Sequence, residues 1–399
     1  MQLRLLIPLV CWFFAAVIHF IQAGLLIFPS TFMHALQHTL AIHPFEIGRL
    51  NEAFLYAYVL MQLPAGLLFD YVSSRLLLMG ACCLLMIGTI MLIVSHGFWM
   101  AIASRICMGI GGSFGFIGAI FLARTWFALA LLPLLAGLTE TIGTSGMICA
   151  SVLFSWLKTQ YPYQDILLVF VVLIACVFTG IWIFMPRRCQ PLKVADKPPI
   201  MQSLHHVIRD PVLWGLGLYA GLMFVSIGVM SSVWGIEYLK QEYHFSTLHA
   251  SLTNGLIVLG FMIGCPITGW LISRVNGMKL MLIAAVMHIG VMFLSFYINV
   301  PFYEEASVLF ILGFLASVSL VPFTITRFYI QKAYFGVASG FINMFFGGIT
   351  IVFIELSGWV LKVTDSYADA SLCVTFSGIV AVIISTSLYF KRSVRCVVV

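Results

Sequence analysis

Charged residues are scarce in this chain: Asp, Glu, Lys and Arg make up 9% of its 399 residues, whereas 62% are hydrophobic. A typical soluble domain carries about 25% charged residues. A chain with so few charges cannot cover this much apolar surface in water, whereas a lipid bilayer is a solvent in which apolar surface is stable. The scarcity of charge therefore excludes an ordinary soluble fold.

Several motifs are also missing from the sequence. It contains no Gly-rich loop ending in Lys-Ser or Lys-Thr, so we do not expect ATP to drive this protein. The ten Cys residues form no C-x-x-C pair and fall mostly in apolar runs, which is typical of small buried hydrophobic side chains. The net charge of +6 is spread over short loops, unlike the basic face of a nucleic-acid-binding protein. We expect no cofactor, no metal and no nucleic acid.

Long apolar runs fill the chain instead. A helix needs about 20 apolar residues to cross a bilayer. The run after Arg4 meets this length and lacks a clear cleavage site, so we interpret it as a membrane span rather than a signal peptide. The sequence predicts an all-α membrane protein whose twelve transmembrane helices form two six-helix pseudo-symmetric bundles. The predicted spans are residues 6–28, 49–69, 76–95, 98–121, 131–156, 164–185, 212–234, 248–271, 279–300, 305–326, 336–361 and 369–390.

The distribution of basic residues predicts the orientation. Cytoplasmic loops of membrane proteins carry an excess of Lys and Arg. With both termini inside, 15 of the 20 Lys and Arg residues fall in cytoplasmic segments and only four in outer segments. We therefore expect a multi-pass protein of the bacterial inner membrane with both termini in the cytoplasm.

The chain divides near its middle. Residues 186–210 form the longest polar stretch and are rich in Pro and basic residues, as expected of an exposed linker. Gly66 and Gly269, each near the end of a predicted helix, are 203 residues apart, about half the chain. Such internal repeats are typical of transporter folds. We predict a six-helix bundle over 1–185, a cytoplasmic linker over 186–210 and a second six-helix bundle over 211–399.

Three segments carry a resemblance to a known family. They read G-L-L-F-D-Y-V-S-S-R at 66–75, R-I-C-M-G-I-G-G-S-F-G at 105–115 and P-I-T-G-W-L-I-S-R at 266–274. Their types and order resemble the signatures of the major facilitator superfamily. The resemblance implies that Asp70 belongs to a cytoplasmic latch, in which it accepts from a helix N-terminus and pairs with Arg124. The implied gate residues are Gly66, Asp70, Arg75, Arg124, Gly269 and Arg274.

A narrower resemblance covers residues 56–66, 126–143 and 340–344, which are similar to bacterial general and sugar-phosphate-permease-like transporters. The chain departs from the superfamily pattern at Tyr71 and Ser73 in the first signature and at Ser273 in the second, where the pattern has an Asp. It also lacks the Gly-Pro motif of the fifth helix in drug/proton antiporters, which disfavours drug export.

Ionisable residues inside the predicted spans are the candidate functional groups. A charge at the bilayer centre costs about 2.5–3.5 kcal/mol on insertion scales, so each one needs a partner or a function. Arg105 and Glu140 lie at similar depths in consecutive helices, and we expect them to meet near a central cavity. Glu140 would titrate or contact substrate, and Arg105 would tune it or bind an anionic group. A permanent ion pair that only locks two helices is the alternative.

The other candidates for the substrate or proton pathway have weaker grounds. His19 and Gln22 share one helix face at i, i+3 spacing, where a hydrogen-bonded core His competes with a pH-sensing one. A solvated helix end competes with a pathway role for Glu52, and a helix interface competes with the cavity for Glu355. Two amides are expected to line the cavity or to bridge helices. These are Asn254 and Asn343.

Together these features predict a secondary active transporter, not an enzyme. It would move a small polar solute, anionic or zwitterionic, by proton-coupled uptake through alternating access, as a monomer in the lipid bilayer. The alternatives are a proton-coupled efflux pump for metabolites or drugs and a sensor that has lost transport. An intramembrane protease is rejected, because the Gly143–Gly146 segment has only the distant His288 as a later intramembrane base for Ser145.

Overall fold

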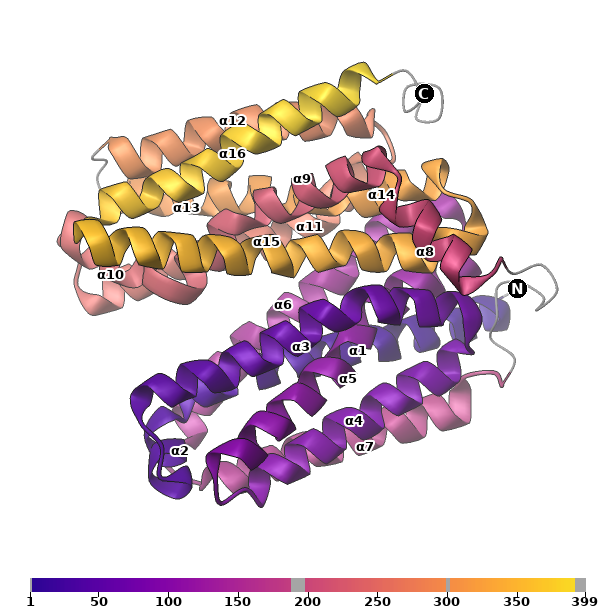
Figure 1. Ribbon diagram of the computed structural model, residues 1–399, viewed down its shortest axis with the longest axis horizontal. Coiled ribbons are helices and arrows are strands. Elements are labelled where there is room, and N and C mark those ends of the chain that lie inside the picture. Colours follow the sequence, from indigo (N-terminus) through magenta and orange to yellow (C-terminus); the bar gives the residue numbers. More distant parts are fainter. Residues whose placement is uncertain (1, 188–197, 299–301, 392–399) are drawn as a thin grey trace. The chain divides into compact units, whose positions relative to one another are not determined.

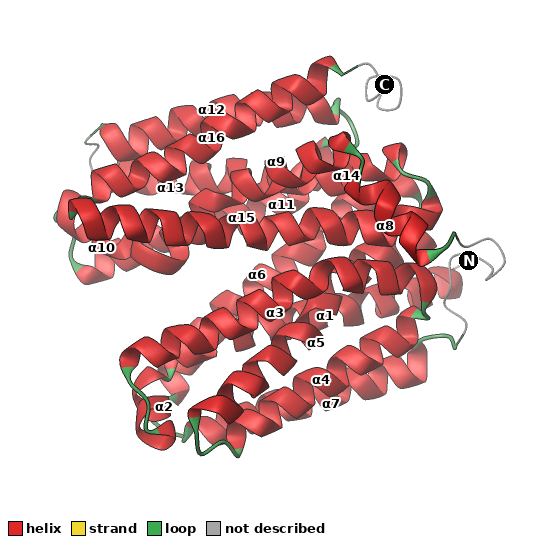
Figure 2. Cartoon of the chain, in the orientation of Figure 1, coloured by secondary structure: helices red, strands yellow, loops and turns green. Residues whose placement is uncertain are grey.

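The computed structural model describes residues 2–187, 198–298 and 302–391. Every regular element in these ranges is helical, and no strand occurs in this part of the chain (Figure 2). The prediction of an all-α protein is therefore confirmed. Residues 188–197 of the predicted linker lie outside the described residues.

Twelve helical segments of the described chain are long and apolar enough to cross a membrane, which confirms the predicted number. Nine are uninterrupted helices: α1 (Gln2–Thr31), α3 (Pro44–Tyr71), α4 (Ser74–Ile93), α5 (Phe98–Trp126), α7 (Tyr163–Phe184), α9 (Pro211–Val229), α11 (Thr247–Leu271), α12 (Gly277–Tyr297) and α16 (Tyr367–Phe390). The other three include 3-10 turns: Leu129–Leu131 with α6 (Leu132–Leu157), α13 (Phe302–Ala316) with Ser317–Leu320 and α14 (Val321–Tyr329), and Lys332–Tyr334 with α15 (Phe335–Thr364).

Short helices connect some of these spans. They are α2 (Met33–Leu40), α8 (Ile200–Ile208) and α10 (Gly235–Glu242), and a π-helical turn, Met230–Trp234, joins α9 to α10. Single π-helical turns are frequent at functional sites.

Side-chain caps explain where several helices begin. Asp210 precedes α9 and accepts a hydrogen bond from the Val212 amide at 2.8 Å, with Pro211 at the first helical position. Asn276 precedes α12 and accepts from the amides of Met278 and Lys279. Both residue types are strongly preferred at this position because they satisfy amides that have no partner within the helix.

The residues group into two compact units. Unit 1 consists of Met1–Leu129, Ile142–Leu204 and Ala333–Gly340, and unit 2 consists of Ala130–Thr141, His205–Lys332 and Phe341–Val399. In unit 1, α5 contacts α1, α3 and α4 (Figure 1), and in unit 2, α11 contacts α13 while α16 contacts α9 and α12. The six-plus-six division at a linker over 186–210 stays a prediction.

Glycine allows the closest helix contacts. In unit 2, a Cβ on Gly260 of α11 would collide with the Phe310 carbonyl of α13, and a Cβ on Gly313 of α13 would collide with the Ile257 carbonyl of α11. Each glycine thus admits the backbone of the other helix, as small residues do in membrane bundles.

Candidate functional site

The end of α3 packs against the first turn of α15 within unit 1. The Asp70 carboxylate is buried and accepts two backbone hydrogen bonds, from Gly336 N to Oδ1 at 2.9 Å and from Val337 N to Oδ2 at 2.8 Å. These amides lie in the first turn of α15, where they have no partner in the helix and where the helix dipole favours an anion. Asp70 therefore holds the end of α3 to the start of α15 by charge.

Glycines make this contact possible. A Cβ on Gly66 would collide with the carbonyl oxygen of Gly336 and lie 2.9 Å from the Cα of Gly340. A Cβ on Gly336 would in turn lie 2.6 Å from Asp70 Oδ1. The two backbones meet because neither Gly66 nor Gly336 carries a side chain.

The two predicted gate arginines of this half have different positions. Arg124 lies near Asp70, close enough for electrostatic interaction, and its guanidinium lies 4.5 Å from the centroid of the Phe335 ring. Arg75 instead donates to the carbonyl of Trp182 in the last turn of α7, a favourable place for a cation. The structure thus brings Asp70 and Arg124 together, while Arg75 braces α4 against α7.

The second signature packs against the start of α6 within unit 2. A Cβ on Gly269 would collide with the carbonyl of Pro133, so this glycine also admits a neighbouring backbone. The position four residues later differs, because Ser273, just after the end of α11, donates to the Trp270 carbonyl in the last turn of that helix at 2.7 Å. Arg274 lies 4.0 Å from the centroid of the Trp270 ring. This contact therefore has the close packing of the first one without the carboxylate at position 273.

A kink proline explains a further contact in this interface. Pro266 lies inside α11 and has no N–H, so the carbonyl four residues earlier, that of Met262, loses its usual partner. Thr141 of α6 donates its hydroxyl to that carbonyl at 2.8 Å. Thr141 was not among the residues predicted from the sequence, although Pro266 indicated a carbonyl that needs a donor.

Arg105 has a similar role in unit 1. Pro29 lies inside α1 and deprives the Leu25 carbonyl of its helical partner. The Arg105 side chain is fully buried, and its Nη1 donates to Leu25 O at 2.8 Å. The guanidinium also donates to Leu26 O at 3.1 Å and to Leu50 O at 3.1 Å.

Arg105 has further neighbours in unit 1. They are the Met108 sulfur, 3.6 Å from Nη1, and the Phe54 ring, whose centroid lies 4.6 Å from Cζ. The hydrogen bonds of Arg105 within unit 1 therefore go to α1, α3 and its own helix, which gives this membrane-embedded cation the partners that it requires. The pairing with Glu140 stays a prediction.

His19 and Gln22 form a buried polar pair on α1. Gln22 Nε2 and His19 Nδ1 lie 3.0 Å apart and share a hydrogen bond. A Cβ on Gly143 of α6 would collide with the imidazole, and a Cβ on Gly115 of α5 would lie 2.8 Å from the His19 amide nitrogen. The imidazole is thus seated where two helices come close at glycines.

The structure shows no single cluster of the remaining predicted residues. Glu140 and Asn254 are buried, and the Asn254 Oδ1 lacks a hydrogen-bond partner in the described residues. A Cβ on Gly235, directly after the π-helical turn, would lie 2.5 Å from that oxygen. The other three candidates differ in exposure: Asn343 is buried, whereas Glu52 and Glu355 are exposed.

A buried carboxyl in unit 2 was not anticipated from the sequence. Glu305, in the first turn of α13, accepts a hydrogen bond from the Ser295 hydroxyl at 2.7 Å. Tyr243 donates to the Ser295 carbonyl at 2.6 Å and lies 3.5 Å from Glu305 Oε2. Burial raises the pKa of Tyr243, and the Glu305 charge raises that pKa further. The Glu304–Glu305 pair at the start of an apolar run was the available signal.

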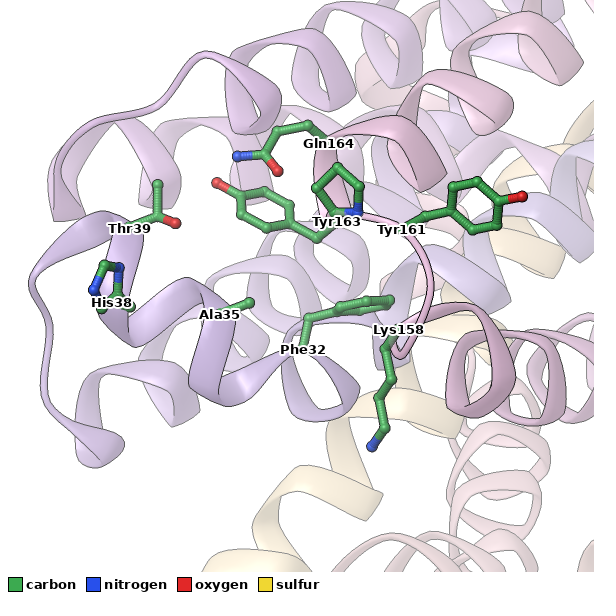
Figure 3. A pocket seen from close by; sticks show the side chains of 9 residues that line it. Phe32, Ala35, His38, Thr39, Lys158, Tyr161, Tyr163 and Gln164 are labelled. Atoms are coloured by element: carbon green, nitrogen blue, oxygen red, sulfur yellow. The ribbon is translucent and has the colours of Figure 1, made fainter.

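The two units each contain a cavity. The cavity in unit 1, of about 320 Å³, lies between α2 and the segment that precedes α7 (Figure 3). Phe32, Tyr163 and Thr39 line it, and Figure 3 shows the Lys158 amine pointing away from the Tyr163 ring. The cavity therefore has a largely uncharged lining.

Twelve membrane-spanning helices, paired glycine contacts 203 residues apart and ionisable side chains inside the spans define a multi-pass membrane transporter. The model of the Major Facilitator Superfamily matches residues 12–354. The chain belongs to this superfamily. It is therefore a secondary transporter of a small molecule and not an enzyme.

Solved structures share this fold. A variant of the E. coli fucose:proton symporter FucP has a TM-score of 0.73 and 16% identity, with 96% of this chain and 98% of that chain covered. A bacterial homologue of the iron transporter ferroportin in the outward-facing state has a TM-score of 0.78 and 15% identity, with 96% and 100% covered. A comparison with curated proteins finds no match. At these identities the likeness shows the fold alone.

Proposed function

We propose that this chain takes up a small polar solute together with protons, by alternating access across a bacterial inner membrane, with both termini in the cytoplasm. The observation that carries the proton coupling is the buried carboxyl of Glu140 inside the α6 span. A proton-coupled transporter needs a group within the membrane that gains and loses a proton as access changes, and intramembrane carboxyls commonly serve this purpose.

Three carboxyls are buried in the described residues, and they differ in their depth within the spans. Asp70 binds the first turn of α15, and Glu305 binds Ser295 at the start of α13. Both lie near the end of their spans. Glu140 lies well inside the span Leu129–Leu157, near the buried thiol of Cys265. Glu140 is therefore the best candidate for the coupling group.

The contacts of Arg105 bear on the charge of the solute that we expect. The sequence favoured an anionic or zwitterionic solute because an arginine was expected beside Glu140. Since Arg105 donates to backbone carbonyls, its charge is already used to hold α1 and α3. Glu140 favours a solute with a cationic group, so we favour a zwitterion such as an amino acid over a simple anion.

The Asp70 contact supports alternating access. Charge-assisted hydrogen bonds to the first turn of α15 are strong but few, so they can close an interface and still break when a substrate-bound state is favoured. We infer that this contact closes the cytoplasmic side and breaks when that side opens. One structural neighbour is a fucose:proton symporter, and this supports proton coupling at the level of shared fold.

Transport by purified protein tests the proposal. A thermal-shift screen of amino acids and organic acids identifies a solute, and its uptake is then measured in proteoliposomes with and without a pH gradient. We expect accumulation only when the outside is acidic, and loss of gradient-driven accumulation in Glu140→Gln. Glu237→Gln is the matched control, because Glu237 is exposed outside the spans and pairs with Lys240.

Three results would contradict parts of the proposal. Gradient-driven accumulation that is unchanged in Glu140→Gln would show that another group couples the proton. Equal uptake with and without a gradient, and no proton flux, would remove coupling altogether and leave facilitated diffusion. Accumulation that requires an acidic interior relative to the outside would reverse the direction and identify an exporter.

A further inference from the structure

The contact between α3 and the start of α15 includes a buried amide side chain, that of Gln62. Gln62, Gly66 and Asp70 follow one another at four-residue spacing, so they lie on one face of α3. A Cβ on Gly340 would collide with the Gln62 carbonyl oxygen and lie 3.0 Å from the Cα of Gly66. The Gln62 side chain is fully buried. Gln62 therefore belongs to the same helix contact as Asp70, about two turns before it.

The amide of Gln62 makes no hydrogen bond with its side-chain atoms among the described residues. The hydroxyl of Ser339, which directly precedes Gly340 and is also buried, has no partner there either. Gln22, another buried glutamine of unit 1, differs because its amide nitrogen shares a hydrogen bond with His19. A buried polar group without a partner costs free energy, because it has given up its bonds to water. Gln62 and Ser339 thus oppose the contact in which they are buried.

Gln62 and Asp70 act on this contact with opposite signs. Asp70 gains two charge-assisted hydrogen bonds where α3 meets α15, whereas the Gln62 amide loses its bonds to water there. Hydrogen bonds to a charged group and the burial of an unpartnered polar group have effects of similar size. The strength of the closed contact is therefore the difference between a gain at its end and a cost two turns away.

We propose that Gln62 weakens the closed contact between α3 and α15 so that the contact can open during transport, with Ser339 acting in the same direction. This role rests on the proposed function, in which the Asp70 contact closes the cytoplasmic side. When the helices separate, water reaches the Gln62 amide and restores its hydrogen bonds. An apolar side chain at position 62 would make the closed state too stable to open at the normal rate. Gln62 is thus a positioning residue, which acts through the helix contact.

Replacing Gln62 by Met tests the cost of the amide, because Met is also unbranched and carries no amide. Hydrogen exchange of residues 333–340, measured by mass spectrometry on the purified full chain, reports the opening of the contact. We expect exchange of this segment to slow about tenfold, the melting temperature to rise and the initial uptake rate in proteoliposomes to fall. Gln202→Met is the matched control and should change none of these, because Gln202 is an exposed residue of helix α8.

A double variant separates this role from a general gain of stability. Asp70→Asn removes charge from the contact and should speed exchange at 333–340. Gln62→Met should reverse this change in the double variant, and uptake should return toward that of the unaltered chain, because a removed cost offsets a weakened gain. Ser339→Ala removes a hydroxyl without enlarging the side chain, so it should act in the same direction as Gln62→Met with a smaller effect.

Two results would overturn the proposal. Faster exchange at 333–340 or a lower melting temperature in Gln62→Met would show that the amide stabilises the closed contact, for example through a bound water. A higher melting temperature with unchanged exchange at 333–340, and without rescue of Asp70→Asn, would show that the amide only weakens packing inside unit 1. A lack of uptake by the unaltered chain would instead contradict the proposed function, and the exchange measurements would still decide whether Gln62 weakens the contact.

Discussion

The carboxylate of Asp70 accepts hydrogen bonds from the backbone amides of Gly336 and Val337, and so joins the end of α3 to the first turn of α15. The amides belong to a helix terminus, so any residue type at 336 and 337 except proline would offer them. The side chain at position 70 therefore decides the strength of this contact, while glycine at 66 and 336 decides whether the backbones come close enough for it to form.

Replacing Asp70 by Asn tests the charge in this contact. An amide oxygen still accepts one hydrogen bond, but the negative charge at the helix terminus and the second acceptor are lost. Hydrogen bonds to charged groups contribute about 1.5–3 kcal/mol, so we expect the closed contact to weaken by roughly tenfold or more. Initial uptake rates in proteoliposomes with equal protein content should fall by a similar factor.

Membrane abundance and a matched variant decide how the Asp70 result is interpreted. Asp165→Asn removes an exposed carboxylate from the first turn of α7, another helix N-terminus, and should transport normally. If Asp70→Asn instead disappears from the membrane while Asp165→Asn does not, the contact is required for folding and is not a latch.

The link between Arg105 and Pro29 predicts non-additive stability. Arg105→Gln removes the donor to the Leu25 carbonyl, and an unsatisfied buried polar group costs about 1–3 kcal/mol. Pro29→Ala restores the N–H that this carbonyl accepts in a regular helix. Arg105→Gln should therefore lower the melting temperature less in the Pro29→Ala background than in the unaltered chain. A double-mutant cycle of melting temperatures in detergent measures this coupling.

Additive effects in that cycle would show that Arg105 stabilises the protein through Leu26, Leu50 and Phe54 rather than through the carbonyl exposed by the proline. Pro8, the other proline inside α1, offers the control. Pro8→Ala lies far along the helix from Arg105's acceptors and should leave the effect of Arg105→Gln unchanged.

The half-buried Tyr243 predicts a loss of stability in alkaline solution. Burial, and then the nearby Glu305 charge, raise the pKa of Tyr243 above its ordinary value near 10. Above about pH 10 the unfolded chain releases this proton while the folded chain retains it, so stability falls as pH rises. Tyr243→Phe should lower stability at neutral pH by about 1 kcal/mol, through the lost bond to Ser295, and should reduce the alkaline loss.

Melting temperatures between about pH 7 and pH 11 check this prediction, because the linkage acts only above about pH 10 and the lower pH values give the baseline. Tyr161→Phe is the control, because Tyr161 is 52% exposed in the segment before α7. An alkaline slope that is the same in Tyr243→Phe and in the unaltered chain would show that other groups cause it. The buried Tyr238, whose pKa burial also raises, is the first alternative.

The sequence was most informative where a pattern has only one physical solution. Apolar runs of spanning length predicted the twelve helices. The glycines at 66 and 269 predicted an internal repeat, and each of them admits a neighbouring backbone within its own unit. Side-chain partners were harder to predict, because they depend on which helices adjoin at a given depth. Arg105 was matched to Glu140 by similar depth and by the short connection between their helices, and nothing in the sequence indicated its hydrogen bond to the Leu25 carbonyl, which Pro29 leaves without a helical partner. Glu305 was overlooked because it begins a span, where carboxylates are usually solvated.

Pro266 leaves a carbonyl without its helical partner, as Pro29 does beside Arg105, and this predicts the effect of replacing Thr141. The result tests whether a side-chain donor is needed at both prolines. Thr141→Val keeps the shape of the side chain but removes the donor to the Met262 carbonyl that Pro266 leaves without a helical partner. Hydrogen bonds between membrane helices contribute about 0.6 kcal/mol on average and up to about 1.7 kcal/mol. Because this carbonyl has lost its own amide, we expect a cost near the upper value, seen as a lower melting temperature.

Thr89→Val is the control. The Thr89 hydroxyl bonds to the Leu85 carbonyl of its own helix at 2.7 Å, where no proline intervenes, so its removal should cost little. Equal costs for the two variants would mean that the Met262 carbonyl finds another donor, and that α6 and α11 are held together by the Gly137 and Gly269 backbone contacts alone.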